Sequence, residues 1–340
     1  MVRSLRGVLV ALPIVSLTLG LPVSSAVAQT KEVTFAHQDM IVPLRLLMAK
    51  GEIEKATGYK ISWKMFGGGG DVIKAMASGE VPIGEVGSSP ATAAASQGMD
   101  VQVIWLLDDI GNAEQLVARN GSGVNSLKDL KGKKVATPFV STAHYQLLAA
   151  LEDAKVNPKE VQILNMRPPE IAAAWERGDI DATFIWHPVL AKVKTNGKVI
   201  ISSGDIAKKG KPTFDAIMVN KAWAEKNKDF VTKLVAAIAK QDGEYRANKG
   251  KWTADSEQVK AVAKIVGAKP EDVPPAMESY NFPSAKEQAS STWLGGGKNG
   301  GIAKSMADTA KFLKEQGRIT NVEADYSKFV NPAYAAAAAK

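Results

Sequence analysis

The sequence predicts an α/β fold built as two lobes. Short apolar segments alternate with helical segments from residue 33 to residue 202, and this alternation restarts near residue 115. A further apolar segment, 216–219, stands alone between charged or flexible stretches. We expect 115–118 and 216–219 to be paired crossover strands that join the two lobes.

The crossovers make lobe one discontinuous and lobe two an insertion. Alanine dominates the end of the chain, which favours a frayed terminus. The predicted boundaries are 29–115 and 219–330 for lobe one, 116–218 for lobe two, and 331–340 for a flexible tail.

Glycine, proline and capping residues punctuate the elements of lobe one. One helix stops near Gly58, and the next begins at a capping Asp71 and ends at Gly79. Pro90 fits the first position of a third helix, with Ser89 as its N-cap. The strands are predicted at 33–37, 61–66, 83–86 and 101–107, and the helices at 44–55, 71–78 and from 90 onward.

Lobe two repeats the alternation, and the C-terminal third is nearly all helical. Glycines at 178 and 197 end two of the helices in lobe two. The strands there are predicted at 134–137, 161–165, 182–185 and 199–202, and the helices at 126–130, 143–154, 170–176 and 188–195. Further helices are predicted at 221–227, 229–248, 255–266 and 302–316.

The N-terminus has the pattern of a secretory signal peptide. Arg3 and Arg6 precede an apolar run over 7–23, and the small residues 26–28 fit a cleavage site after Ala28. A membrane anchor is the alternative, but the run is short for a span and no other stretch is apolar enough. The 340-residue chain has no cysteine, hence no disulfide, no thiolate metal site and no lipidated cysteine. We expect an exported protein, free in a bacterial periplasm.

Charge and histidine spacing exclude several classes of partner. The formal charge is +8, or +6 without the two signal-peptide arginines, and the lysines are scattered rather than clustered around aromatic residues. Nucleic acid is therefore not an expected partner. His37, His144 and His187 are far apart and form no metal-ligand pattern. No metal and no cofactor are expected.

Two helix starts are candidate anion sites. Ser141 and Thr142 follow a short strand and begin a helix, and His144 could add a side-chain donor. Ser88 and Ser89 occupy the same kind of position after the third strand of lobe one. Helix N-termini present free N–H groups and a partial positive charge, and ligands of open α/β sheets bind at the carboxyl ends of strands. The alternative is that both starts are ordinary structural caps.

Acidic residues beside the crossovers could hold an ammonium group. Glu114 and Asp215 directly precede the two predicted crossovers, and Glu85 is a weaker candidate on the third strand. Trp186 ends a strand and suits a pocket wall. The alternatives are solvated loop acids and a tryptophan packed in the core.

Serine catalysis and phosphate-loop binding have little support in the sequence. Residues 87–91 read Gly-Ser-Ser-Pro-Ala, without the closing glycine of a nucleophile elbow. The four glycines 67–70 are not followed by Gly-Lys-Ser/Thr, so they predict a flexible turn rather than a P-loop. No catalytic residue is assigned.

Four longer segments resemble the aliphatic sulfonate-binding family, and within it the periplasmic receptors of taurine ABC importers. The resemblance runs from about residue 33 to residue 329 and is most specific at 138–150 and 168–181. His37, Glu85 and His187 depart from the family pattern. The matching segments are 84–90, 138–150, 168–181 and 310–317.

The resemblance implies a type II periplasmic-binding fold and a non-enzymatic receptor. Its ligand would be taurine, with the sulfonate at the two helix starts, the amine at Asp215, and Gln38 and His37 on the pocket wall. It also implies a monomer that delivers its ligand to the membrane permease of an ABC importer. Receptors for another alkanesulfonate or a sulfate ester are the nearest alternative, and a secreted serine hydrolase is a more distant one.

Overall fold

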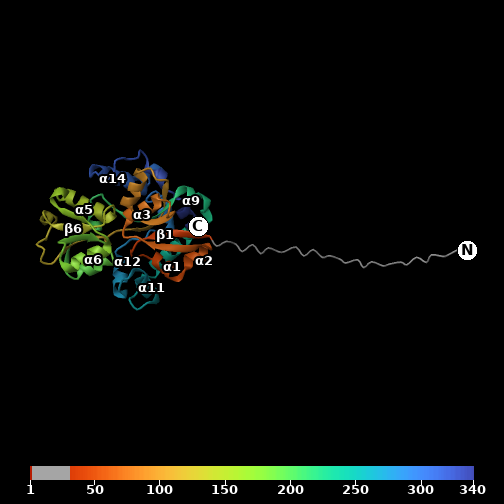
Figure 1. The fold of residues 1–340 in the computed structure, drawn as a ribbon, viewed down its shortest axis with the longest axis horizontal. Coiled ribbons are helices and arrows are strands. Elements are labelled where there is room, and N and C mark those ends of the chain that lie inside the picture. The colour runs from red at the N-terminus through yellow and green to blue at the C-terminus, as the bar shows by residue number, and fades with distance from the viewer. Residues whose placement is uncertain (2–30) are drawn as a thin grey trace. The chain divides into compact units, whose positions relative to one another are not determined.

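Two five-stranded sheets with helices packed on them form the protein (Figure 1). The computed structural model describes Met1 and residues 31–340; the predicted signal peptide and its cleavage site lie outside the described residues. The predicted α/β class is confirmed. No helix in the described part of the chain is both long and apolar enough to serve as a membrane span.

The first sheet combines strands from both ends of the chain. β1, β2 and β3 are parallel, and β10 lies antiparallel between β3 and β4. β3, β4 and β10 are almost wholly buried, as expected for strands covered on both faces, and β4 is the richest of them in Val, Ile and Leu. The strands in spatial order are β2 (Lys60–Met65), β1 (Glu32–His37), β3 (Ile83–Gly87), β10 (Phe214–Asn220) and β4 (Val101–Asp109). The N-terminal helices are α1 (Leu44–Lys50), α2 (Glu52–Thr57), α3 (Gly69–Ala77) and α4 (Ser88–Ser96).

The second sheet is formed by the middle of the chain. β6, β7 and β8 are parallel, and β5 lies antiparallel between β8 and β9. The strands in spatial order are β7 (Gln162–Asn165), β6 (Lys134–Thr137), β8 (Ala182–Ile185), β5 (Gln115–Arg119) and β9 (Gly197–Ser202). The helices of this part are η1 (Leu127–Leu130), α5 (Thr142–Asp153), η2 (Pro158–Glu160), α6 (Pro168–Arg177), α7 (Val189–Lys194) and α8 (Ser203–Ala207).

The two predicted crossover strands do not pair with each other. β5 belongs to the second sheet and β10 to the first, so the chain passes between the sheets over 110–114 and 208–213 instead. The first sheet therefore takes up β10 from Phe214 onward, earlier than the predicted boundary at 218–219. The reason is physical: an apolar strand can be buried in either sheet, and its sequence does not specify the neighbour.

The C-terminal third packs on the first sheet as a set of helices. The predicted flexible tail is different in the structure, because helix α15 packs against α10 and α13, with Tyr334 and Ala335 buried. Alanine is the best helix former, and Tyr334 supplies an apolar anchor. The elements are α9 (Lys221–Lys226), α10 (Lys228–Ala247), η3 (Lys249–Lys251), α11 (Glu257–Val266), η4 (Pro270–Asp272), α12 (Val273–Glu278), α13 (Ala285–Ala289), η5 (Gly297–Asn299), α14 (Gly301–Glu315), η6 (Tyr326–Phe329) and α15 (Ala333–Ala338).

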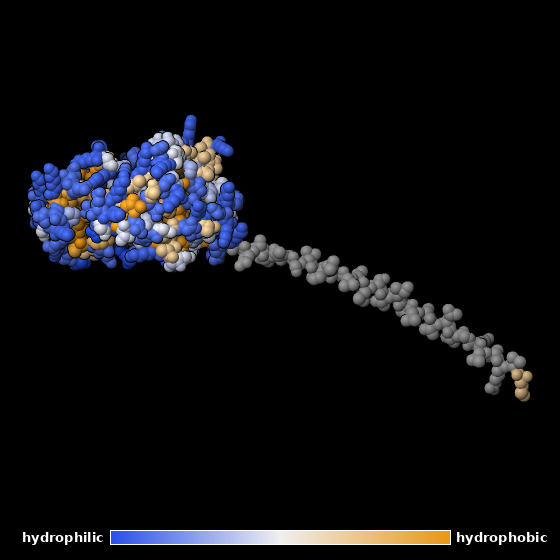
Figure 2. Space-filling view, turned by 90° about the horizontal axis from the view of Figure 1, so that it is seen from above, coloured by the Kyte–Doolittle hydropathy of each residue, from blue (hydrophilic) through white to orange (hydrophobic). Residues whose placement is uncertain are grey.

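Hydrophilic residues dominate the molecular face shown in Figure 2, where apolar residues are scattered. Among the large apolar side chains of the described residues, Met65 on the edge strand β2 is 61% exposed. Exposed apolar residues of this isolated kind are normal for a water-facing surface.

Two glycines of the first lobe should respond in opposite ways to alanine. Gly243 lies inside α10, where an added Cβ would meet nothing nearer than Arg246 Nη2 at 3.7 Å. Gly243→Ala should raise the free energy of unfolding by about 0.5–1 kcal/mol, because alanine loses less backbone freedom on folding. At Gly84 a Cβ would lie 2.7 Å from Val72 Cγ1, so Gly84→Ala should lower stability by about 1–3 kcal/mol. Urea denaturation measures both; shifts of the same sign would contradict the packing described here.

Candidate ligand-binding site

A small cavity lies where the carboxyl ends of strands from both sheets meet. Gln38 follows β1, Gly87 ends β3, and Trp186 follows β8. Ligands of open α/β sheets bind at such edges. The cavity volume is about 10 Å³, near the room that one water molecule needs. It is lined by Gln38, Met40, Gly69, Gly87, Pro90, Glu114, Ser141, Thr142, Trp186, Asp215 and Tyr280.

Three helix N-termini converge on this cavity. Gly69 begins α3, Gly87 is the N-cap of α4, and Ser141 is the N-cap of α5. Ser141 Oγ accepts the backbone N–H of His144 at 3.0 Å and donates to the carbonyl of Pro138 at 2.6 Å. The remaining first-turn N–H groups have no acceptor inside their helices. This side of the cavity is therefore suited to an anion.

The start of α4 differs from the prediction by two residues. Gly87, in extended conformation, is the N-cap, so Ser88 and Ser89 are the first two helical residues and Pro90 is the third. Both serine side chains are buried and neither lines the cavity. Glycine is also an acceptable N-cap, which the sequence pattern of two serines before a proline concealed.

Acidic residues also line the cavity, next to the starts of α4 and α5. Glu114 and Asp215 line it, and Asp108 lies directly opposite Asp215 in the β4–β10 register. Burial raises the pKa of Asp215 to about 7 and, together with the Asp215 charge, raises the pKa of Glu114 well above its usual range. Burial and the same neighbouring charge raise the pKa of Asp108 as well. Two buried carboxyl groups thus line the cavity, with a third, that of Asp108, behind them, and burial favours the protonated form of all three.

Thr142 connects the start of α5 to the acids of the cavity. Its hydroxyl donates to Glu114 Oε1 at 2.5 Å. The side chain comes close to the first sheet only because residue 87 is glycine: a Cβ there would lie 2.6 Å from Thr142 Cγ2 and 3.1 Å from Asp215 Oδ1. At Gly87 the end of β3 therefore lies in close contact with the start of α5, next to the acids.

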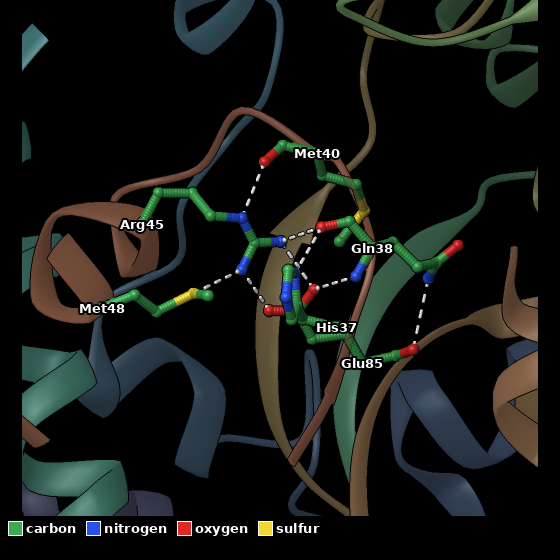
Figure 3. Close-up of polar contacts among 6 residues, drawn as sticks. All are labelled: His37, Gln38, Met40, Arg45, Met48 and Glu85. Atoms are coloured by element: carbon green, nitrogen blue, oxygen red, sulfur yellow. Dashed lines mark hydrogen bonds and ion pairs between the residues drawn. The ribbon is translucent and has the colours of Figure 1, made fainter. Parts of the chain in front are cut away.

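Glu85, an expected amine contact, does not line this cavity. It forms a bidentate ion pair with Arg45, with both nitrogen–oxygen distances 2.6 Å and both side chains fully buried (Figure 3). Its charge is already compensated inside the protein. Arg45 was not anticipated from the sequence, where it lies on an apolar helix like an ordinary surface residue.

The three histidines stay outside the cavity lining. His144 stacks on Phe139 with ring centroids 4.5 Å apart, and its Nδ1 lies 3.4 Å from the backbone N–H of Val140. Burial lowers the pKa of His144 to about 3 and that of His187 to about 4, so both rings are neutral. His37 Nδ1 lies 3.0 Å from the carbonyl of Gln38, and burial lowers the pKa of its ring too.

Trp186 and Tyr280 form the aromatic part of the lining. Trp186 Nε1 donates to Asp39 Oδ1 at 2.7 Å, a contact between the second lobe and the loop after β1. Tyr280 was missed by the sequence prediction. It reaches the site because the neighbouring Asn281 exchanges backbone hydrogen bonds with Asp109 at the end of β4. Such a long-range bridge leaves no local signal in the sequence.

A wider cleft lies beside the cavity and contains the glycine-rich turn. Its volume is about 560 Å³, and it is lined by parts of both lobes, among them Gly67, Phe139 and Arg318. Arg167 of the second lobe pairs with Asp71 at 2.9 Å across it, with the Arg167 side chain against Gly67. Within the described residues, no group of three or more His, Asp or Glu side chains could hold a metal ion.

The arrangement of strands and helices agrees with comparisons to known proteins. A family model described as NMT1/THI5 like matches residues 55–244, more than half of the chain. The chain belongs to the NMT1/THI5-like family.

Curated members similar to this NMT1/THI5-like chain are binding proteins. The Taurine-binding periplasmic protein of Escherichia coli (strain K12) is 36% identical over 303 residues, covering 89% of this chain and 92% of that protein. A Putative aliphatic sulfonates-binding protein of Bacillus subtilis (strain 168) is 28% identical over 242 residues, 69% of this chain and 72% of that protein.

Solved structures establish the fold independently. The periplasmic aliphatic sulphonate binding protein SsuA from Escherichia coli has a TM-score of 0.68 at 21% identity, covering 88% of this chain and 92% of that one. The alkanesulfonate-binding protein SsuA from Xanthomonas axonopodis pv. citri, bound to MOPS, has a TM-score of 0.68 at 20% identity, covering 86% and 95%. The predicted periplasmic-binding fold is confirmed.

The buried acids should make the stability of the protein pH-dependent. Unfolded aspartate has a pKa of about 3.9, whereas that of Asp215 in the folded protein is about 7. Between these values the folded state holds a proton that the unfolded chain has released, so the free energy of unfolding falls as pH rises. Asp215→Asn should reduce the fall between pH 5 and pH 7 by roughly 2 kcal/mol.

Denaturation curves at several pH values, without ligand, measure this effect. Asp308→Asn, which changes an exposed acid on α14, is the matched control and should keep the wild-type pH dependence. An unchanged slope in Asp215→Asn would show that this carboxyl does not hold the proton.

Proposed function

We propose that this protein is a periplasmic receptor that binds taurine and delivers it to an ABC importer. One observation carries the proposal: the lining of a single cavity combines helix N-termini with the carboxyl groups of Glu114 and Asp215. Taurine is a zwitterion with matching ends, a sulfonate and an ammonium. The curated relative named as a taurine-binding periplasmic protein supports the same ligand.

The sulfonate would lie against the first turns of α3, α4 and α5. A sulfonate is anionic at any cellular pH, so it needs N–H donors rather than a counter-charge. The hydroxyl groups of Ser141 and Thr142 already donate to Pro138 and Glu114, which leaves backbone N–H groups as the main donors. Ser88 and Ser89 would contribute through their backbone, and His144 through the packing of the α5 turn.

The ammonium would lie between Asp215 and Glu114. Both are buried, so a charge-assisted hydrogen bond there is stronger than one in water. The incoming cation favours the charged form of both carboxyls and offsets their mutual repulsion. Gln38 and Trp186 complete the wall, and His37 supports Gln38 from behind.

Binding would require the lobes to open and close. The cavity has room for about one water molecule, so the lobes would have to move apart to admit taurine. Two contacts span the lobes in this closed form, Trp186 to Asp39 and Arg167 to Asp71. Bending within 110–114 and 208–213, where the chain passes between the sheets, would separate them. The closed, ligand-loaded form would be the one that docks on a permease.

A role without catalysis fits the chemistry of the site. Solved structures with this fold include a desulfurization enzyme, at a TM-score of 0.59 and 12% identity. The present chain has no cysteine. Among the described residues, neither Ser88 nor Ser141 hydrogen-bonds a histidine ring, as a serine hydrolase would require. A receptor for another alkanesulfonate or a sulfate ester remains the alternative that the ligand test separates.

The signal peptide and the lack of cysteine favour a protein free in the periplasm, with cleavage after Ala28. The resemblance to the sulfonate-binding family favours a monomeric mature chain.

A ligand panel tests the proposal. Taurine at 100–1,000 times its dissociation constant should stabilise the protein by roughly 3–4 kcal/mol in thermal unfolding. Ethanesulfonate and sulfate lack the ammonium, and glycine betaine has a carboxylate in place of the sulfonate and an ammonium without N–H donors, so each should stabilise it less. Asp215→Asn should lower taurine affinity by at least about tenfold while ethanesulfonate binding changes little.

Stronger stabilisation by ethanesulfonate than by taurine would favour the alkanesulfonate alternative. No stabilisation by taurine would refute the proposed ligand.

A further inference from the structure

The Arg45–Glu85 ion pair lies directly behind the cavity wall. Arg45 Nη1 and Nη2 each lie 2.6 Å from a carboxylate oxygen of Glu85, and neither side chain is exposed (Figure 3). Taking two charges out of water is costly, and replacing such a pair by apolar side chains is often neutral or stabilising. Folding alone therefore gives no clear reason for this pair.

The pair holds the loop that forms one wall of the cavity. Arg45 donates to the carbonyl of Met40 through Nε and to that of Gln38 through Nη2, both at 3.0 Å. Glu85 accepts the backbone N–H of Gln38 at 3.0 Å, and its own carbonyl accepts Gln38 Nε2 at 3.2 Å. Gln38 and Met40 both line the cavity, and Asp39 between them bonds Trp186 of the other lobe.

The pair also acts on the acidic side of the cavity. In the β3–β10 register Asp215 lies opposite Gly87, which places Glu85 diagonally across from it on the same face of the sheet. Gly87 has no side chain to separate them. The charge of Glu85 raises the pKa of Asp215 and the charge of Arg45 lowers it. The two formal charges sum to zero and act on Asp215 in opposite directions, whereas either one alone would act in one direction only.

We propose that the Arg45–Glu85 pair is a selectivity determinant of this site, because it fixes the Gln38–Met40 wall while keeping the background behind Asp215 electrically neutral. Arg45 is needed for the backbone carbonyls of the wall, and Glu85 is needed to cancel its charge. The cationic end of a ligand then meets Asp215 and Glu114 without a competing cation. This inference rests on the proposed function, a zwitterionic aminosulfonate ligand.

Unbalancing the pair provides the test. Glu85→Gln keeps the shape but leaves the Arg45 cation uncompensated, free to repel an ammonium or to pair with Asp215 itself. Taurine affinity should fall at least about tenfold relative to that of ethanesulfonate, which lacks the amine. The double variant Arg45→Met with Glu85→Gln removes both charges and also the Arg45 hydrogen bonds to the wall, so both ligands should bind more weakly. Because the charge imbalance is gone, the taurine-to-ethanesulfonate affinity ratio should return to within about threefold of wild type.

Isothermal titration of each variant with both ligands gives the ratio, and thermal unfolding shows that each variant is folded. Glu80→Gln, which breaks an exposed pair with Lys64, is the matched control and should leave the ratio unchanged. If Glu85→Gln weakens both ligands by the same factor, or if the double variant keeps the single variant's ratio, the pair is structural only and the inference is overturned. Wild-type protein that binds no taurine would instead refute the proposed function, and this inference with it.

Discussion

The close approach of the start of α5 to Gly87, at the end of β3, is the constraint on which the site depends. With no Cβ at this position, Thr142 of the second lobe and Asp215 of the first can occupy neighbouring space. That proximity brings the Thr142 hydroxyl to Glu114 and the starts of α3, α4 and α5 to one cavity. A larger side chain would separate an electropositive surface from an electronegative one, and each alone would be an ordinary feature of an α/β protein.

The electrostatics of the cavity follow from burial rather than from the number of charges. Burial removes three acids from water: Glu114, Asp215 and Asp108. Because burial disfavours the charged form of a carboxyl group, the pKa of each is raised. The Arg45 charge acts against this at Asp215, but the charge of its partner Glu85 acts in the opposite direction. Glu114 and Asp215 are therefore suited to the cationic group of a ligand, and the helix starts are suited to its anionic group. The site is complementary to a zwitterion because it combines buried carboxyl groups with the N–H groups of helix starts.

Local patterns in the sequence predicted much of the site, and long-range contacts account for the rest. Ser141, Thr142 and Trp186 stand at strand ends, where turn and capping signals are strong, and they line the cavity as expected. The crossover strands were correctly located but wrongly paired, since an apolar strand does not encode its neighbour.

Other residues differ for equally specific reasons. Glu85 looked like an acid available to a ligand because its partner Arg45 lies 40 positions earlier in the chain. Tyr280 depends on the bridge between Asn281 and Asp109, and α15 on its contacts with α10 and α13. The binding roles themselves stay predictions, since they depend on a ligand's contacts.

Glu114 and Asp215 have one more property in common: each stands at the end of a passage between the sheets, one at the end of 110–114 and the other just after 208–213. A cation held by both would bind beside the two segments that connect the lobes. A small movement there would change the angle between the lobes by a large amount.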